Sequence, residues 1–136
     1  MIAADTSVLV AVALPWHEAH QQALEALRGD RSALIAHVAV ETYSVLTRLP
    51  GSQRVPAPTA RAFLDLAFEG PPIVLSAIEY GRLLDLVAAE GIVGGAVYDA
   101  LVAATAREAD ATLVTLDRRA LRTYRLVGAD YRLIDG

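Results

Sequence analysis

The sequence predicts an α/β fold, a three-layer α/β/α sandwich in which helices cover both faces of a central, mainly parallel sheet of short strands. Two observations favour this fold. Apolar segments of only a few residues alternate along the chain with longer segments of helical periodicity. Proline or glycine separates most of these segments, and both residues interrupt helices. Strands that alternate with helices pair in parallel through right-handed crossovers, which place helices on both faces.

The expected strands are short and apolar, as strands buried between two layers of helices are. The segment 112–115 is also rich in β-branched residues, which favour strands. In chain order, the expected strands are residues 2–4, 33–36, 73–75, 112–115 and 131–134.

The expected helices are recognised by their apolar faces and by the residues that end them. Pro15, Gly29 and Pro50 stop the first three. Ser76 is expected to cap the fifth, and Ile78 to lie on its inward face. In chain order, the expected helices are residues 7–14, 16–28, 38–49, 58–68, 76–90, 97–109 and 117–123.

The composition fits a single domain, residues 1–136, that folds without disulfides. A chain of this length buries about two-thirds of the surface that its unfolded form exposes. It has no cysteine, which excludes cysteine-bound zinc and suits a reducing cytosol. All twelve basic residues are arginine, and the absence of lysine excludes a Walker-type phosphate loop and Schiff-base chemistry. The net charge of −4 argues against a general polyanion binder.

The apolar content predicts a protein partner. Hydrophobic residues make up 54% of the chain, which is high for a small domain and indicates surplus apolar surface that a second copy or another protein covers. The amino terminus has no basic segment of a secretion signal, and charges interrupt every apolar stretch before about 18 residues. The expected location is therefore the cytoplasm, without a membrane span.

Four acidic residues stand out by their positions in this scheme. They are Asp5, which directly follows an expected strand, Asp117, which follows the segment LVTL at the end of another, Asp99 in the first turn of a helix entered through glycines, and Glu41 on an otherwise apolar helix. Ligands of open parallel sheets gather outside the carboxyl ends of the strands, where these acids are expected. Taken singly, each acid has a simpler explanation: the aspartates could cap helix N-termini or complement their charge, and Glu41 could pair with Arg48 or another arginine.

Taken together, the four acids point to divalent cations. Carboxylates that converge on one sheet edge repel one another, and their pKa values rise unless cations neutralise them. Magnesium and manganese prefer oxygen ligands and keep several bound waters, which leaves positions for a phosphate oxygen and a nucleophilic water. The sequence therefore predicts an oxygen-ligated Mg²⁺ or Mn²⁺ site.

The same residues lie in stretches that resemble a known family. The chain is similar to PIN-domain ribonucleases, specifically to VapC toxins of bacterial toxin–antitoxin pairs. The matching stretches are IAADTSVLVAVAL, WHEAHQQALEAL, AHVAVETYSVLTRLP and GAVYDALVAATAREADATLVTLDRRAL. The last is the most specific, because it joins the aspartate at a helix start to the aspartate at a strand end.

The resemblance implies a site and its ligands. Asp5, Asp99 and Asp117 would be the nearest ligands of the metal, and Glu41 would close the cluster. The residues whose hydroxyls would orient carboxylates or bound water are Thr6, Ser7 and Thr115. For Ser7, a role as a hydroxyl at a helix start is an equal explanation.

The resemblance also implies an activity and partners. The protein would be an endoribonuclease toxin that hydrolyses RNA with one or two metal ions and leaves a 5′-phosphate and a 3′-hydroxyl, and a cognate antitoxin would neutralise it. The arginines that could contact the RNA backbone, or simply be solvated, are Arg48, Arg54, Arg118, Arg119 and Arg122. Residues 51–58 lie where such toxins tend to vary.

Two other classes of protein are weighed against the nuclease. One is a catalytically silent PIN-fold module that binds RNA or protein, which the presence of all four acids disfavours. The other is a haloacid-dehalogenase-type phosphatase, which requires a second aspartate two residues after the first and a lysine. Position 7 is serine and the chain has no lysine, which argues strongly against the phosphatase.

Overall fold

The structure is a computed structural model that describes residues 1–134. Its sheet has the strand order β2-β1-β3-β4, and every neighbouring pair is parallel. The strands are β1 (Ile2–Ala4), β2 (Ser32–Ala33), β3 (Thr112–Thr115) and β4 (Tyr131–Leu133). Because all four run the same way, their carboxyl ends lie at one edge.

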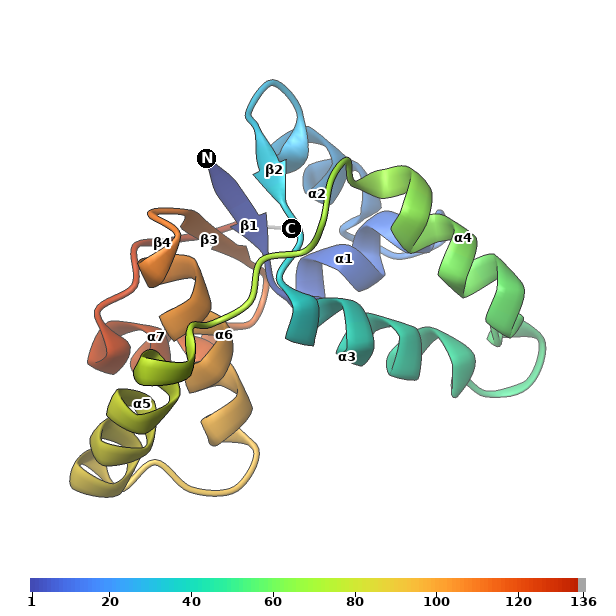
Figure 1. Cartoon of the computed structure of the whole chain (residues 1–136). Helices are drawn as coiled ribbons and strands as arrows, with labels where there is room; N and C mark the ends of the chain where they lie inside the picture. The colour runs from blue at the N-terminus through green and yellow to red at the C-terminus, as the bar shows by residue number, and fades with distance from the viewer. Residues whose placement is uncertain (135–136) are drawn as a thin grey trace.

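Helices cover the sheet on both sides, so the predicted three-layer sandwich is confirmed. The helices are α1 (Thr6–Ala13), α2 (His20–Leu27), α3 (Ala36–Thr47), α4 (Ala57–Ala67), α5 (Ala77–Glu90), α6 (Ala96–Glu108) and α7 (Leu121–Val127). In Figure 1, α5, α6 and α7 gather on one side of the sheet, and α1, α3 and α4 lie on the other. Both α1 and α6 pack against β3. No helix within residues 1–134 has the length and apolarity that a membrane crossing requires.

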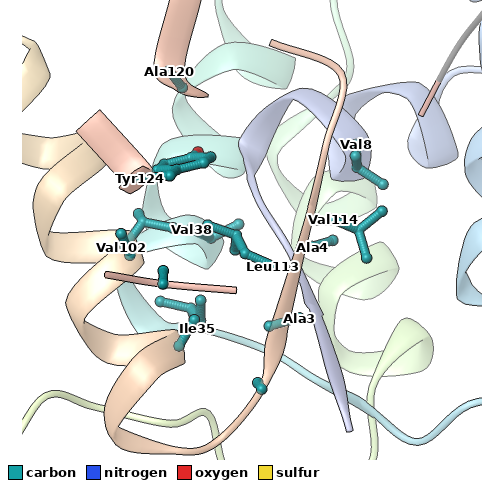
Figure 2. Close-up of a cluster of buried hydrophobic side chains, with 14 of the residues drawn as sticks. Ala3, Ala4, Val8, Ile35, Val38, Val102, Leu113, Val114, Ala120 and Tyr124 are labelled. Carbon is teal, nitrogen blue, oxygen red and sulfur yellow. The ribbon is translucent and has the colours of Figure 1, made fainter. Parts of the chain in front are cut away.

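The core forms on both faces of the central strands. Ala3 and Ala4 of β1 and Leu113 and Val114 of β3 are at most 2% exposed. Figure 2 shows these side chains among residues of the surrounding helices, including Tyr124 of α7. Small alanine side chains in β1 let helices approach the sheet closely, which compensates for the shortness of the strands.

The prediction of a strand at 73–75 is wrong, and the strand predicted at 33–36 is displaced. Ile73 makes a single parallel bridge to Ile35. This segment belongs to the connection from α4 to α5 that crosses the molecule in Figure 1. Pro71 and Pro72 precede it without backbone donors, which keeps the pairing short. Strand β2 ends at Ala33 because the chain enters α3 soon afterwards.

Two helix predictions also need correction. Residues 16–19 form turns, and α2 begins only at His20; the Nδ1 atom of His17 accepts a hydrogen bond from the Ala19 N–H at 3.0 Å. Ile78, expected on the inward face of α5, is 71% exposed. Ser76 does precede α5, but its hydroxyl donates to the Glu108 carboxylate instead of capping the helix.

Candidate acidic metal site

Asp5 and Asp117 lie at the ends of neighbouring strands. The register pairs Ala4 of β1 with Val114 of β3, and the Asp5 N–H donates to the Val114 carbonyl at 3.0 Å. Asp5 caps α1, since its Oδ1 accepts from the Val8 N–H at 3.3 Å. Asp117 caps the 3-10 turn η2 (Arg118–Ala120). Both aspartates therefore cap helices, as the simpler explanation expected, and both also lie at the carboxyl edge of the sheet.

Asp99 and Glu41 come to the same edge on two helices that contact each other, α6 and α3. The chain enters α6 through Gly94, whose φ of +61° lies in the left-handed region that favours glycine. Asp99 follows in the first turn. Asp99 does not cap the helix, because the N-cap residue is Gly95.

The Asp5 carboxylate is almost fully enclosed and is held through both of its oxygens. It is 5% exposed. Ser7 Oγ and the Val8 N–H donate to its Oδ1, and the Tyr124 hydroxyl donates to its Oδ2 at 2.7 Å. Burial raises the pKa of Asp5, and the hydrogen bonds, with Thr115 close by, oppose that rise. Asp5 is therefore fixed in place.

The three hydroxyl residues predicted beside the acids connect them. Ser7 Oγ accepts from the Leu116 N–H at 2.9 Å, which ties α1 to the end of β3. Thr115 is fully buried, and its Oγ1 accepts from the Asp117 N–H at 2.9 Å. Thr6 Oγ1 donates to Glu41 Oε1 at 3.3 Å. These bonds link the loops that carry the acids.

Asp99 is the acid most affected by its neighbours. Burial, together with the charges of Asp117, Glu41 and Asp5, raises its pKa to about 6. No hydrogen bond or ion pair among residues 1–134 holds its carboxylate. The four acids are thus close enough to repel one another.

Glu41 does not pair with Arg48, contrary to the alternative considered from the sequence. His37 Nε2 lies 3.1 Å from Glu41 Oε1, within ion-pair distance but misaligned for a hydrogen bond. The His37 ring stacks on Tyr98, with ring centroids 5.3 Å apart and planes 1° from parallel. A histidine and a tyrosine therefore border the acids where α3 meets α6.

The arginines predicted to contact RNA fall into two groups. Those that follow Asp117 are exposed: Arg118, Arg119 and Arg122. The second group, Arg48 and Arg54, comes before Asp117 in the chain. Arg48 lies about 10 Å from Glu41 along the axis of α3, at 1.5 Å per residue. It donates to Ser44 Oγ at 3.2 Å. Arg54 donates to the Leu49 carbonyl at 3.0 Å. Contact of these five arginines with RNA stays a prediction.

The donor set fits a hard divalent cation. Four carboxylates supply oxygen ligands only, and their mutual repulsion is what a cation would relieve. As they stand, however, no three acidic or histidine side chains of residues 1–134 form a group that could hold an ion. Among the four acids, Asp99 is the one whose carboxylate makes no hydrogen bond within residues 1–134, whereas Asp5, Asp117 and Glu41 each accept at least one.

Sequence reasoning missed two residues of this region, Tyr124 and His37. Tyr124 reaches Asp5 across 119 positions of the chain, and no local pattern signals such a contact. The helix predicted at 117–123 ended one residue before Tyr124, whereas the observed α7 continues to Val127. His37 lies one helical turn before Glu41, a spacing that brings side chains together.

Fold and site together define a class of protein: a parallel α/β domain with a cluster of carboxylates at the carboxyl edge of its sheet. The sequence matches the PIN domain family over residues 2–126. The chain belongs to that family.

Individual relatives agree with this assignment. The chain is 47% identical over 135 residues to Ribonuclease VapC40 of Mycobacterium tuberculosis, covering 98% of this chain and 99% of the relative. It is 41% identical over 127 residues to Ribonuclease VapC27 of the same organism, covering 93% and 92%. The crystal structure of VapBC2 from Rickettsia felis bound to a promoter DNA fragment matches with a TM-score of 0.69 at 22% identity, covering 99% of this chain and 100% of that chain. This last similarity shows the fold.

Proposed function

We propose that the protein is a VapC-type toxin, an endoribonuclease that depends on a divalent metal and hydrolyses phosphodiester bonds of RNA. The observation that carries the proposal is the convergence of four carboxylates at one sheet edge, where burial and the charges of the other three acids raise the pKa of Asp99. Two relatives that match nearly the whole chain are named ribonucleases, which supports the same activity.

The residues have distinct parts in this proposal. Asp5, Asp99 and Asp117 hold the metal, and Glu41 closes the cluster beside Thr6. A bound Mg²⁺ or Mn²⁺ supplies a polarising charge for the phosphate and a water of lowered pKa. Ser7 and Thr115 keep the loops that carry the aspartates in register, through the bonds to Leu116 and Asp117. The exposed arginines after Asp117 contact the RNA backbone.

RNA cleavage by purified protein tests this proposal. Single-stranded RNA should be cleaved with Mg²⁺ or Mn²⁺, and EDTA should stop the reaction. Asp99→Asn should abolish cleavage, because the substitution removes the negative charge that attracts the cation and keeps the size of the side chain. The matched control is Asp85→Asn, on the exposed surface of α5. Full cleavage by Asp99→Asn, or cleavage unaffected by EDTA, would contradict the proposal.

The second candidate is a silent PIN-fold module, and one observation favours it: no ready group of three ligands exists within residues 1–134. Thermal unfolding with and without Mn²⁺ separates the two functions. A metal-dependent nuclease is stabilised by Mn²⁺, because an ion that binds only the folded state shifts the unfolding equilibrium. A silent module unfolds at the same temperature with and without the ion.

We also propose that the surplus apolar surface serves two protein partners, a cognate antitoxin and a second copy of this chain. Large apolar side chains are exposed on several helices: Val40 on α3, Leu66 on α4, and Ile78 and Leu84 on α5. Unpaired surface of this kind is typical of an interface. Light scattering of the purified protein should give the mass of a dimer, and a monomer at micromolar concentration would exclude the second copy. The absence of cysteine suits a cytoplasmic location.

A further inference from the structure

Tyr124 makes the longest-range side-chain contact of the acidic site. Its hydroxyl, on α7, donates to Asp5 Oδ2 at 2.7 Å. The residue is 1% exposed, and Figure 2 shows its ring among the buried side chains. The bond joins the last helix of the fold to the end of the first strand.

A tyrosine at this position has a cost that phenylalanine would avoid. A buried hydroxyl loses its hydrogen bonds to water, and its burial is unfavourable unless a protein partner replaces them. The Tyr124 hydroxyl can only donate to the carboxylate oxygen that lies 2.7 Å from it, because an ionised carboxylate has no proton to give. The acceptor is the Asp5 carboxylate and not a backbone carbonyl. The hydrogen bond therefore acts on a residue of the acidic site.

The bond completes the restraint on Asp5. Ser7 and Val8 donate to Oδ1, Tyr124 donates to Oδ2, and the Thr115 hydroxyl also interacts with the carboxylate. With both oxygens held, the carboxylate cannot rotate about its Cβ–Cγ bond without breaking a hydrogen bond. Without the Tyr124 hydroxyl, Oδ1 would keep its two donors and Oδ2 would lose its bond to Tyr124.

We propose that Tyr124 is a positioning residue of the metal site, whose hydroxyl fixes Asp5 Oδ2 so that the other acids can close on a carboxylate that is already in place. The proposal rests on the metal-dependent function proposed above. A group that orients a metal ligand typically changes metal affinity about 10–100-fold when it is removed.

Tyr124→Phe tests the proposal, because it removes the hydroxyl and keeps the ring. The matched control is Tyr131→Phe, since Tyr131 packs against Tyr124 with ring centroids 6.3 Å apart and has its hydroxyl near Arg125 instead of an acid. Electron paramagnetic resonance titration should show Mn²⁺ affinity about 10–100-fold weaker in Tyr124→Phe and unchanged in Tyr131→Phe. At saturating Mn²⁺, the KM for RNA should be unchanged. Wild-type Mn²⁺ affinity in folded Tyr124→Phe would overturn the proposal.

A measurement on the wild-type protein keeps the proposal testable if Tyr124→Phe does not fold. The hydroxyl proton of Tyr124 should give a slowly exchanging, low-field NMR signal that persists as Mg²⁺ is added. Loss of the signal at saturating Mg²⁺ would show that the ion displaces the bond and would overturn the proposal. Failure of the proposed function is distinct, because the wild-type protein itself would then bind no Mn²⁺ and cleave no RNA.

Discussion

At the scale of single residues, Asp5 and Asp99 are carboxylates in opposite conditions. Asp5 caps α1, accepts hydrogen bonds on both oxygens and is 5% exposed. Asp99 has no such partner within residues 1–134 and faces the charges of the other three acids. The site therefore combines one acid that is fixed by hydrogen bonds with one whose carboxylate makes none within the described residues.

The raised pKa of Asp99 predicts how metal-free stability depends on pH. A carboxyl whose pKa is about 6 in the folded state and 3.8 in the unfolded state favours folding when protonated. That contribution is complete below about pH 3.8 and is lost as the pH rises through about 6. Asp99→Asn should therefore stabilise the metal-free protein at pH 7.5, by about 1 kcal/mol after solvent screening.

Thermal unfolding in EDTA checks this prediction. The gain in Tm of Asp99→Asn over wild type should be about 2–6 °C at pH 7.5 and should vanish near pH 4. Asp85→Asn, on the exposed face of α5, should show no such trend. An equal gain in Tm at pH 4 and at pH 7.5 would show that repulsion among ionised acids does not cause the stabilisation of Asp99→Asn.

At the scale of elements, the entry into α6 sets the position of Asp99. Gly94 has φ +61°, whereas Gly95 has φ −60° and ψ −29°, in the helical region. A Cβ atom would meet no other atom within 4 Å at either glycine. The two positions therefore differ in backbone conformation and not in available space.

This difference makes a matched pair of variants. Gly94→Ala should lower the free energy of unfolding by about 1–2 kcal/mol, because an L-residue is strained at positive φ. Gly95→Ala should be neutral or stabilising by up to about 1 kcal/mol, since alanine restricts the unfolded chain. Urea denaturation measures both values. Equal effects of the two substitutions would show that α6 is not entered as described.

The same elements show what could be predicted from the sequence. Strand β3 combines an apolar run, β-branched residues and a following aspartate, so local pattern was sufficient for it and for Asp117. The segment 73–75 has an equally apolar pattern but forms only one bridge, because pairing depends on a neighbour that local pattern does not reveal. For the same reason, the Tyr124–Asp5 bond could not be foreseen.

At the scale of the whole molecule, one core supports both the sheet and the site. Leu113 of β3 is fully buried, while Leu66 of α4 is 87% exposed. Leu113→Ala should destabilise the protein by about 2–5 kcal/mol through lost burial and the cavity that remains. Leu66→Ala should change stability by less than about 0.5 kcal/mol in the isolated protein. Chemical denaturation of both variants checks this, and a small effect at Leu113 would argue against the described core.

The convergence of the acids is also a property of the whole molecule. Parallel pairing of β1 and β3 places Asp5 beside the end of β3, and the contact of α3 with α6 brings Glu41 and Asp99 to the same edge. The order of strands and helices was enough to predict this convergence. Metal coordination also depends on the side-chain rotamers of the acids. These rotamers depend on the bound ion, so the sequence pattern could not predict them.

Locating bound Mn²⁺ by its anomalous X-ray scattering tests the central claim most directly. Crystals grown with MnCl₂ should show an anomalous peak within about 2.0–2.3 Å of carboxylate oxygens of Asp5, Asp99 and Asp117. The Asp99 side chain should have turned toward Asp5. A protein saturated with Mn²⁺ that shows no peak among these acids would contradict the account.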